Sequence, residues 1–417
     1  METHAVLGDY ISTQKGFAFK STWFVNSGRK IVKVSDFTED SISPTNLVKI
    51  PDDLAEQYSR YSLTVGDVVI QTVGSWPSNP ASVVGKTIRV PKTVSGSLLN
   101  QNAVKIIPNE EVYSGFLYYL LRSEDFKEYI IGTAQGAASQ ASITLDAIKR
   151  FKFTLPTFDV QESIASKLEN YDKLIENNNR RIAILEDMAQ SLYREWFINF
   201  RYPNHQDNLD ADGNPKLIDS PLGQIPDGWE VKRLDDLASV NPQSITKKNA
   251  PDDIGYIDIK SVGTGTINEI KPMSFDDAPS RARRLVVDGD IIWATVRPNR
   301  KQYSYICKPA PNTIASTGFA VLRSKSLPAS YLYSFTTTDS FTGYLVNHAT
   351  GSAYPAVNAD IFQKADILVP PQKLMEKFDE LCSGAISQSE VLKKKNKNLQ
   401  QQRDMLLPKL ISGQIEL

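Results

Sequence analysis

The fold is decided by a stretch that the chain contains twice, VGDVVIQTVG (65–74) and DGDIIWATVR (288–297). Each copy starts with a Gly-Asp turn and continues as an apolar, β-rich run that ends in polar residues, which is the pattern of a buried strand. Self-similarity of this kind is the signature of a duplicated structural unit. The stretch therefore predicts two related domains, each with strands at its centre.

The duplication extends outward from this stretch in the same order. FLYYLLRSEDF (116–126) returns as YLYSFTTTDSF (331–341), and GAASQASITLDAIKRFKFTLP (136–156) returns as GSAYPAVNADIFQKADILVP (351–370), one residue shorter. Short Val, Ile, Thr and Tyr runs broken by Gly, Pro and Asn, such as VVGKTIRVP (83–91), fill the N-terminal half of each copy. We expect an α/β fold with two globular, strand-rich units.

Each copy is followed by a long helical pattern whose seam positions recur in alternating steps of four and three, as in a coiled coil. The first series, in which only Asn178 is polar, is Ile164, Leu168, Tyr171, Ile175, Asn178, Ile182, Leu185, Ala189, Leu192 and Trp196. The second is weaker, because Ser389, Asn396 and Arg403 interrupt Phe378, Cys382, Ala385, Leu392, Leu399 and Leu406.

Two helices of this kind, each about 55 to 60 Å long at 1.5 Å per residue, need a partner for their apolar stripes. Leu185 and Leu192 correspond to Leu399 and Leu406 at the same offset, so the helices are copies of each other. We expect them to pair as an antiparallel coiled coil, with one domain at each end. The alternative is that each helix only covers its own domain.

The expected organisation has five parts. Between the copies, a stretch rich in Pro, Gly, Asp and Asn and without periodicity is expected to be a linker. The parts are a first domain at 1–157, a first spacer helix at 158–200, the linker at 201–226, a second domain at 227–370 and a second spacer helix at 371–417.

Composition limits the class of protein. Of 417 residues, 41% are hydrophobic and 23% charged, which is typical of a globular protein too long for a single core. No apolar run reaches the roughly 18 residues of a membrane span, so we expect a cytoplasmic protein without membrane contact. Cys307 and Cys382 lack partners at metal-ligand spacing, so neither a disulfide framework nor a zinc site is expected.

The net charge of -1 requires any DNA-binding surface to be local. The clearest basic cluster is interrupted only by Asp288 and Asp290. It consists of Arg281, Arg283, Arg284, Arg297, Arg300 and Lys301. A solvated surface is the ordinary alternative for such a cluster.

Catalytic patterns are weak throughout the chain. The sequences NPAS (79–82) and NPQS (241–244) lack the second Pro and the aromatic residue of a base-methylating loop, and no phosphate-binding Gly-Lys loop occurs. PDDIGYIDIK (251–260) loosely matches a nuclease pattern through Asp252, Asp258 and Lys260, but alternation on the polar face of a strand explains it better. NLDADGNPKLID (208–219) partly matches the sequence pattern of a calcium-binding loop, but a turn-rich linker explains it better.

Four segments together resemble the specificity subunits of type I restriction-modification systems, and the resemblance covers essentially the whole chain. They are 192–238 (LYREWFINFRYPN to SPLGQIPDGWEVKRLDDLA), FKFTLPTFDVQESI (151–164), ADILVPPQKLMEKF (365–378) and LLPKLISGQIEL (406–417). Two departures concern the domain starts and the second helix. The first copy lacks the Pro-x-Gly-Trp opening that the second has at 226–229, and KLMEKF keeps only Glu376 of the usual Glu-Gln pair.

The resemblance implies a DNA-recognition subunit that is not itself an enzyme. Each recognition domain would read one half of a split, asymmetric site in double-stranded DNA, and the helices would fix the spacing between the halves. It also implies two modification subunits that methylate adenine with S-adenosylmethionine, and restriction subunits that use ATP and Mg²⁺. The chain itself would hold no cofactor and no metal. Its net charge close to zero fits a recognition subunit that needs partner subunits to enclose the DNA.

Base reading needs side chains with paired donors and acceptors on loops that enter a groove. By this criterion the first domain offers Gln71, Thr72 and Trp76, with Gln135 and Gln140 in the loop GTAQGAASQ (132–140). The second domain offers Arg297, Asn299, Arg300 and Lys301, with Tyr354 in GSAYP (351–355). The alternative for each of them is a solvated loop residue. Two further functions stay open, a self-contained restriction endonuclease or methyltransferase and a coiled-coil adaptor without a DNA role.

Overall fold

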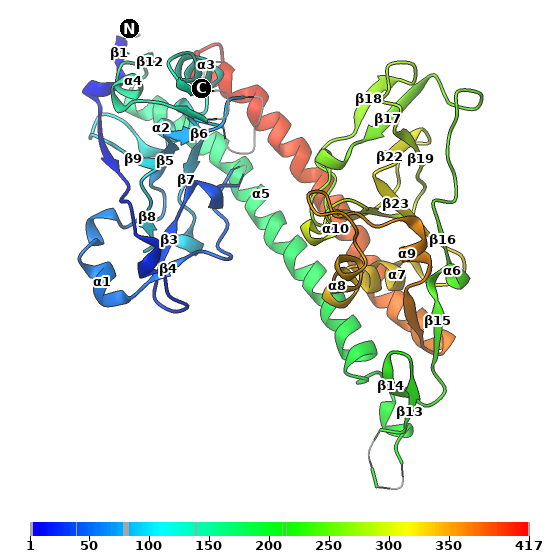
Figure 1. Cartoon of the computed structure of the whole chain (residues 1–417). Coiled ribbons are helices and arrows are strands. Elements are labelled where there is room, and N and C mark those ends of the chain that lie inside the picture. Colours follow the sequence, from blue (N-terminus) through cyan, green and yellow to red (C-terminus); the bar gives the residue numbers. More distant parts are fainter. Residues whose placement is uncertain are drawn as a thin grey trace. The chain divides into compact units, whose positions relative to one another are not determined.

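The computed structural model describes residues 3–38, 40–77, 83–137, 140–210, 212–213 and 215–415, so that NPAS (79–82) lies outside the described residues. The chain divides into two compact units. Unit 1 comprises Met1–Ile175 with Asn398–Leu417, and unit 2 comprises Glu176–Lys397. Each long helix therefore contributes one segment to each unit (Figure 1).

The main sheet of unit 1 has four antiparallel strands in the order β2-β9-β5-β7, namely Ile11–Lys15, Ala103–Pro108, Val68–Gln71 and Thr87–Arg89. A smaller sheet has the order β4-β3-β8, namely Lys49–Ile50, Arg29–Val32 and Leu98–Leu99. Strand β1 (Thr3–Val6) pairs with β12 (Lys152–Leu155). Helices α1 to α4 span Asp52–Glu56, Ser114–Leu120, Glu124–Gly132 and Leu145–Lys149.

Unit 2 repeats this topology. Its main antiparallel sheet has the order β16-β23-β20-β21, namely Ala238–Val240, Phe319–Ser324, Ile291–Ala294 and Tyr303–Tyr305. The second sheet has the order β18-β17-β22-β19, namely Lys271–Ser274, Asp253–Ile257, Thr313–Ser316 and Ala282–Leu285. Strand β15 (Glu230–Arg233) pairs with β24 (Asp366–Val369). Helices α6 to α9 span Leu234–Leu237, Ala329–Thr336, Asp339–Asn347 and Ala359–Gln363.

The duplicated stretch forms the central strands β5 and β20. All four residues of each strand are buried, because both faces of the main sheet are covered. In unit 1, Val68 and Ile70 pack in one apolar cluster with α2 and α3, whereas Val69 belongs to a second cluster on the other face. A strand buried on both faces needs a continuous apolar run instead of an alternating one. The predicted strand-rich α/β units and their internal repeat are confirmed.

The two predicted long helices are confirmed as α5 (Phe158–Tyr193), which continues as a π-helical turn at Arg194–Ile198, and α10 (Gln372–Ile411). The segments pair antiparallel in unit 2, because Asn178 contacts Asn396 whereas Glu186, further along α5, contacts the earlier Ser389. Asn396 is held twice, accepting from Asn178 at 2.8 Å and donating to Asn179 at 2.8 Å. Polar pairs of this kind in a coiled-coil seam specify register.

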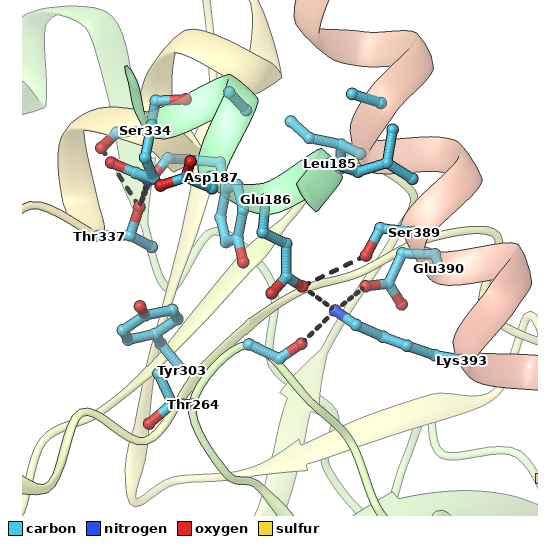
Figure 2. A pocket seen from close by; sticks show the side chains of 16 residues that line it. Leu185, Glu186, Asp187, Thr264, Tyr303, Ser334, Thr337, Ser389, Glu390 and Lys393 are labelled. Atoms are coloured by element: carbon cyan, nitrogen blue, oxygen red, sulfur yellow. Dashed lines mark hydrogen bonds and ion pairs between the residues drawn. The ribbon is translucent and has the colours of Figure 1, made fainter. Parts of the chain in front are cut away.

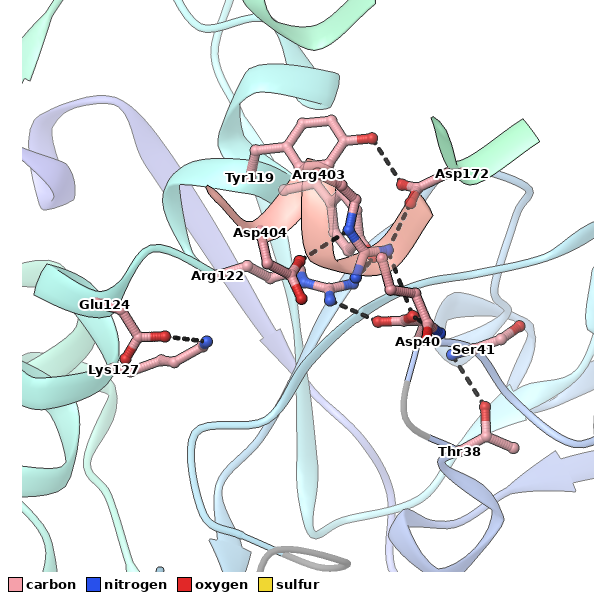
Figure 3. A network of polar contacts seen from close by, with 12 residues as sticks. Thr38, Asp40, Ser41, Tyr119, Arg122, Glu124, Lys127, Asp172, Arg403 and Asp404 are labelled. Atoms are coloured by element: carbon pink, nitrogen blue, oxygen red, sulfur yellow. Dashed lines mark hydrogen bonds and ion pairs between the residues drawn. The ribbon is translucent and has the colours of Figure 1, made fainter. Parts of the chain in front are cut away.

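The long helices α5 and α10 also contact each other in unit 1. Arg403 on α10 is 4% exposed, and its Nη1 lies 2.7 Å from Asp172 on α5 and 3.3 Å from Asp40 of the globular part. Asp172 also accepts a hydrogen bond from the Tyr119 hydroxyl, and Asp40 accepts one from Arg122 (Figure 3). The polar positions that interrupt the second seam, Ser389, Asn396 and Arg403, therefore all bind residues of α5.

The acid sensitivity of unit 1 follows from Asp40. Burial alone would raise the pKa of Asp40, but Arg122 and Arg403 hold it below its ordinary value of 3.8. A carboxyl group with a depressed folded pKa stabilises the fold above its unfolded pKa, and this stabilisation disappears as the pH falls through the folded pKa. We expect unit 1 to lose stability as the pH falls below 3.8.

The measurement is the thermal unfolding midpoint between about pH 2 and 6, for the native chain and for Asp40→Asn. Asp40→Asn should lower the midpoint near neutral pH and flatten its decline in acid. Glu124→Gln, which removes an exposed carboxylate of an ion pair with Lys127, is the matched control and should retain the native slope. Parallel acid profiles for Asp40→Asn and the native chain would contradict this assignment.

The expected linker contains regular structure that its composition did not predict. Strands β13 (Leu217–Ser220) and β14 (Gly223–Pro226) form an antiparallel hairpin. The Ser220 hydroxyl closes its turn by donating to the Gly223 carbonyl at 2.6 Å. The predicted linker at 201–226 therefore includes a β-hairpin at 217–226. Among the residues that the structure describes, none of the helices combines the length and apolar character that a membrane crossing needs.

Candidate nucleic-acid interface

Two of the five residues predicted in unit 1 lie on one small sheet, and a third is hydrogen-bonded to it. Strand β6 (Val73–Gly74) pairs with β11 (Gln140–Ser142), and β11 pairs with β10 (Gln135–Ala137). Gln135 and Gln140 are exposed on the hairpin, and the indole of Trp76 donates to the Ala137 carbonyl at 2.9 Å. The structure therefore groups Trp76, Gln135 and Gln140 on one surface, although more than fifty residues separate Trp76 from the hairpin.

Gly136 explains how this hairpin closes. Its φ of +151° is a conformation that residues with a side chain rarely adopt, and a Cβ there would lie 2.1 Å from the Gln140 carbonyl oxygen. A side chain at position 136 would therefore separate the two strands. The glycine places Gln135 and Gln140 on adjacent strands of a tight hairpin, from which their amides face solvent.

Gln71 and Thr72 occupy a different environment from the one expected. Gln71 is 1% exposed and Thr72 is 3% exposed. The Gln71 amide donates to the Val73 carbonyl at 3.0 Å, and the backbone of Thr72 bonds Asn102 and Ile143. These two residues support the strand from which the loop emerges, and their side chains do not face solvent. We therefore leave Gln71 and Thr72 out of the proposed contact surface.

The corresponding surface of unit 2 centres on Arg297 and Tyr354. The Arg297 guanidinium lies over the Tyr354 ring at 4.4 Å and donates to the Ala353 carbonyl at 3.1 Å. Its backbone N–H donates to the Pro355 carbonyl at 2.7 Å. Tyr354 is 67% exposed, so this stacked pair faces solvent. The structure brings these two predicted residues into direct contact.

The turn after Arg297 displays the other predicted residues. Arg297 and Lys301 have φ values of 52° and 51°, in the left-handed region that residues with a Cβ rarely adopt. Between them, the 3-10 turn Pro298–Arg300 exposes Asn299 and Arg300. Lys301 pairs with Asp339 at 2.6 Å at the surface. Backbone strain held in place by neighbouring hydrogen bonds is a feature of pre-organised binding loops.

The two surfaces occupy equivalent places in the duplicated fold. The Ile143 N–H donates to the Thr72 carbonyl in unit 1, and the Val357 N–H donates to the Thr295 carbonyl in unit 2, each at 2.9 Å. The next residue caps a short helix in both units, Thr144 for α4 and Asn358 for α9. The same loop pair thus carries glutamines and a tryptophan in unit 1 but arginines, an asparagine and a tyrosine in unit 2.

The predicted basic cluster comes from two separate strands. Arg281, Arg283 and Arg284 belong to the β19 region, in a different sheet from the strand β20 that precedes Arg297. Arg281 pairs with Asp258 at 3.2 Å, Arg283 packs on Phe275, and burial lowers the pKa of Arg284. The basic residues of the expected cluster therefore come from separate strands, and Arg281 and Arg283 are engaged with residues of unit 2.

Asp258, the key residue of the nuclease-like pattern, has a structural role. It follows β17, which ends at Ile257, and its carboxylate caps the 3-10 turn Ile259–Ser261 as well as pairing with Arg281. The expected strand through 251–260 therefore ends earlier than predicted. In the calcium-like stretch, the Asn208 amide donates to the Tyr202 hydroxyl, and Asp219 lies in the β13–β14 hairpin.

A cluster of aromatic rings and cations in unit 1 was not predicted as a whole. Phe19 is buried and Phe17 packs with it in the same apolar cluster, as expected of core residues. Lys20 lies over Trp23 at 5.5 Å, and Arg60 lies over Tyr61 at 4.6 Å. Cations and partly exposed rings of this kind suit contact with a nucleic-acid backbone and its bases. No sequence spacing joins these segments, so the sequence pattern did not predict that they come together.

Comparison with known proteins extends over most of the chain. The family model described as "Type I restriction modification DNA specificity domain" matches residues 6–187 and 226–399. The specificity subunit of the type I restriction enzyme MjaIX from Methanocaldococcus jannaschii is 27% identical over 330 residues, which cover 76% of this chain and 73% of that protein. The HindI specificity subunit from Haemophilus influenzae is 21% identical and covers 95% of both chains.

One solved structure supports the fold. The crystal structure of a type I restriction-modification S subunit from M. genitalium matches with a TM-score of 0.55. The match covers 99% of this chain and 96% of that one, at 14% sequence identity. At this identity the likeness concerns the fold, in which two related domains alternate with two long helices.

Proposed function

Because the chain belongs to the family of type I restriction-modification DNA specificity domains, and so is a DNA-recognition subunit, we propose that its two units read different halves of a split site. The observation that carries this proposal is the pair of equivalent loop surfaces with unlike side chains. Gln135 and Gln140 face solvent in unit 1, with the half-buried Trp76 beside them, where Arg297, Asn299, Arg300 and Tyr354 lie in unit 2. Two recognition domains with the same backbone fold but different side chains at the contact surface recognise an asymmetric sequence.

The side-chain chemistry favours particular bases for each unit. Glutamine and asparagine form bidentate hydrogen bonds with adenine, and arginine forms them with guanine. We therefore assign adenine contacts to Gln135 and Gln140 in unit 1, and guanine contacts to Arg297 or Arg300 in unit 2. Lys301 is assigned to phosphate, because an ammonium is a point charge without the bidentate geometry of a guanidinium.

The paired helices are proposed to act as a spacer. Register-fixing contacts lie along them, Asn178 with Asn396 in unit 2 and Asp172 with Arg403 in unit 1. A pair that cannot slide fixes the separation of the half-sites, and the bases between them need no contact.

The proposed partners are double-stranded DNA, two modification subunits and restriction subunits, assembled in the cytoplasm. We assign adenine methylation with S-adenosylmethionine, and cleavage with ATP and Mg²⁺, to those partner subunits. The proposal that this chain performs no catalysis is supported by Asp258, which caps a turn and pairs with Arg281.

Arg297→Gly tests base reading without disturbing the turn. Glycine accepts the φ of 52°, and unit 1 has Gly74 at the corresponding position, so the fold should be retained. Loss of a bidentate guanine contact costs about 1 to 3 kcal/mol of discrimination, or roughly 5- to 150-fold. We expect the assembled complex to bind its own motif and variants of the second half-site with nearly equal affinity.

The measurement is DNA binding by fluorescence anisotropy with the modification subunits present. Arg201→Ala removes an arginine charge elsewhere in unit 2, from an exposed pair with Glu195, and should leave discrimination unchanged. Lys301→Ala should weaken binding to all sequences alike. Undiminished discrimination by Arg297→Gly, together with native unfolding behaviour, would remove Arg297 from the reading surface.

A further inference from the structure

Unit 2 contains a cavity of about 240 Å³ beside the paired segments of α5 and α10. It is lined by side chains of both helices, by helix α7 and by Thr264 and Tyr303 (Figure 2). In Figure 2 the Glu186 carboxylate reaches toward Ser389 and Lys393 of α10. Ligand pockets for drug-sized molecules measure about 300 to 1,000 Å³, so this one suits a single side-chain-sized group.

The internal repeat explains why the space is there. Ala189 corresponds to Arg403 at the same offset that relates Leu185 to Leu399, and Ile386 corresponds to Asp172. Ser334 corresponds to Tyr119 in the repeated helix. All three residues of unit 2 line the cavity. Ala189 and Ser334 are smaller than their counterparts, and Ile386 lacks the charge of its counterpart. Where unit 1 holds a guanidinium between carboxylates, unit 2 has a hollow.

The cavity lining carries an excess of negative charge. Glu186, Asp187 and Glu390 line it together with one cation, Lys393. The Lys393 ammonium is already shared between Glu186 at 2.8 Å, Glu390 at 2.8 Å and the Gly265 carbonyl at 2.6 Å. Burial raises the pKa of Glu390, and the Lys393 ammonium opposes this rise. The electrostatic environment therefore favours a further cation.

Two more features point to a bound polar group. Ser334 is 1% exposed, and its hydroxyl has no hydrogen-bond partner among the described residues. A buried hydroxyl without a partner costs free energy, which a ligand that donates a hydrogen bond recovers. Tyr303 and Tyr333 also line the cavity, and burial, followed by the Glu186 charge, raises the pKa of Tyr303 to about 12. Neutral phenol rings offer their faces to a cation.

We propose that this cavity binds an alkylguanidinium group, which takes the place that the Arg403 side chain fills in unit 1. Glu186 supplies the counter-charge, Ser334 accepts a hydrogen bond, and the rings of Tyr303 and Tyr333 pack against the cation. The group belongs either to a free small molecule or to an arginine side chain of another subunit. This site is independent of the DNA-reading loops and stands apart from the proposed function.

The test is calorimetric titration of the full-length chain with agmatine, a small alkylguanidinium compound. We expect one site per chain. Ala189→Leu fills the cavity and should abolish binding, and Glu186→Gln should weaken it about tenfold, the equivalent of 1.4 kcal/mol. Ile184→Leu is the matched control, because Ile184 lies on the same helix with 60% of its surface exposed and does not line the cavity.

The source of the group is distinguished by repeating the titration on the assembled complex. Exclusion of agmatine by the partner subunits would assign the guanidinium to an arginine of a partner. Retained binding would assign it to a free molecule. Lack of binding by the folded native chain at millimolar agmatine, or equal binding by Ala189→Leu and the native chain, would overturn the proposal.

Discussion

Arg403→Ala is expected to destabilise unit 1 by about 3 kcal/mol, because removal of one partner from a buried ion pair leaves Asp172 without a cation and Asp40 with Arg122 alone. Arg403 is 4% exposed and lies between Asp172 and Asp40, which are 18% and 21% exposed. Partial exposure of these carboxylates lets water replace some of the lost interaction. The estimate is therefore placed at the lower end of the range for buried pairs.

Urea unfolding combined with hydrogen exchange measures this effect, because exchange reports which amides lose protection. Protection should fall in unit 1 first. Lys127→Ala breaks an exposed pair with Glu124 on the same unit and should cost at most about 1 kcal/mol. If Arg403→Ala proves no more destabilising than Lys127→Ala, the network in Figure 3 does not hold α10 to unit 1.

Arg323→Ala should have the largest effect on unit 2, at about 3 to 5 kcal/mol. The Asp290 carboxylate is fully buried, and Arg323 binds both of its oxygens at 2.8 Å. Asp290 also accepts the Val287 N–H at 2.8 Å, which closes the Gly-Asp turn before the central strand. Without Arg323, the Val287 N–H is the one hydrogen-bond partner of the buried carboxylate within the part of the chain that the structure describes.

Unit 1 provides the matched comparison for this variant. Asp67 is the repeat counterpart of Asp290, accepts the Thr64 N–H at 2.8 Å and pairs with Lys105 at 3.0 Å. Its side chain is 18% exposed, so Lys105→Ala should cost less than Arg323→Ala. Urea unfolding of both variants measures the difference. Equal losses would show that burial of the carboxylate does not set the cost.

The large-scale fold was predictable because its signals are periodic. The duplicated Gly-Asp stretch gave the central strands, and the seam from Ile164 to Trp196 gave α5 almost to its last turn. In the sequence, the polar residues Ser389, Asn396 and Arg403 interrupt the apolar seam of the second helix and make its coiled-coil pattern weaker. Their partners Glu186, Asn178 and Asp172 lie on the other helix, and a linear pattern does not pair positions across two helices.

The proposed reading surface was only partly predictable. Trp76, Gln135, Gln140, Arg297 and Tyr354 lie where paired loops meet, as their positions after the repeated strands indicated. Gln71 and Thr72 were wrongly expected to project, because the covering of both sheet faces buries the end of β5. The hairpin at 217–226 had a local signal, since Pro221 and Gly223 in Ser-Pro-Leu-Gly suit the second and fourth positions of a tight turn.

The most direct test of DNA recognition is a base-resolution map of N6-methyladenine in host cells with and without this chain, with the partner methyltransferase expressed in both. We predict that deletion removes methylation at one split, asymmetric motif, and that Arg297→Gly relaxes only one of its half-sites. Unchanged methylation in the deletion strain, with an active methyltransferase, would contradict the central claim that this chain supplies the sequence specificity.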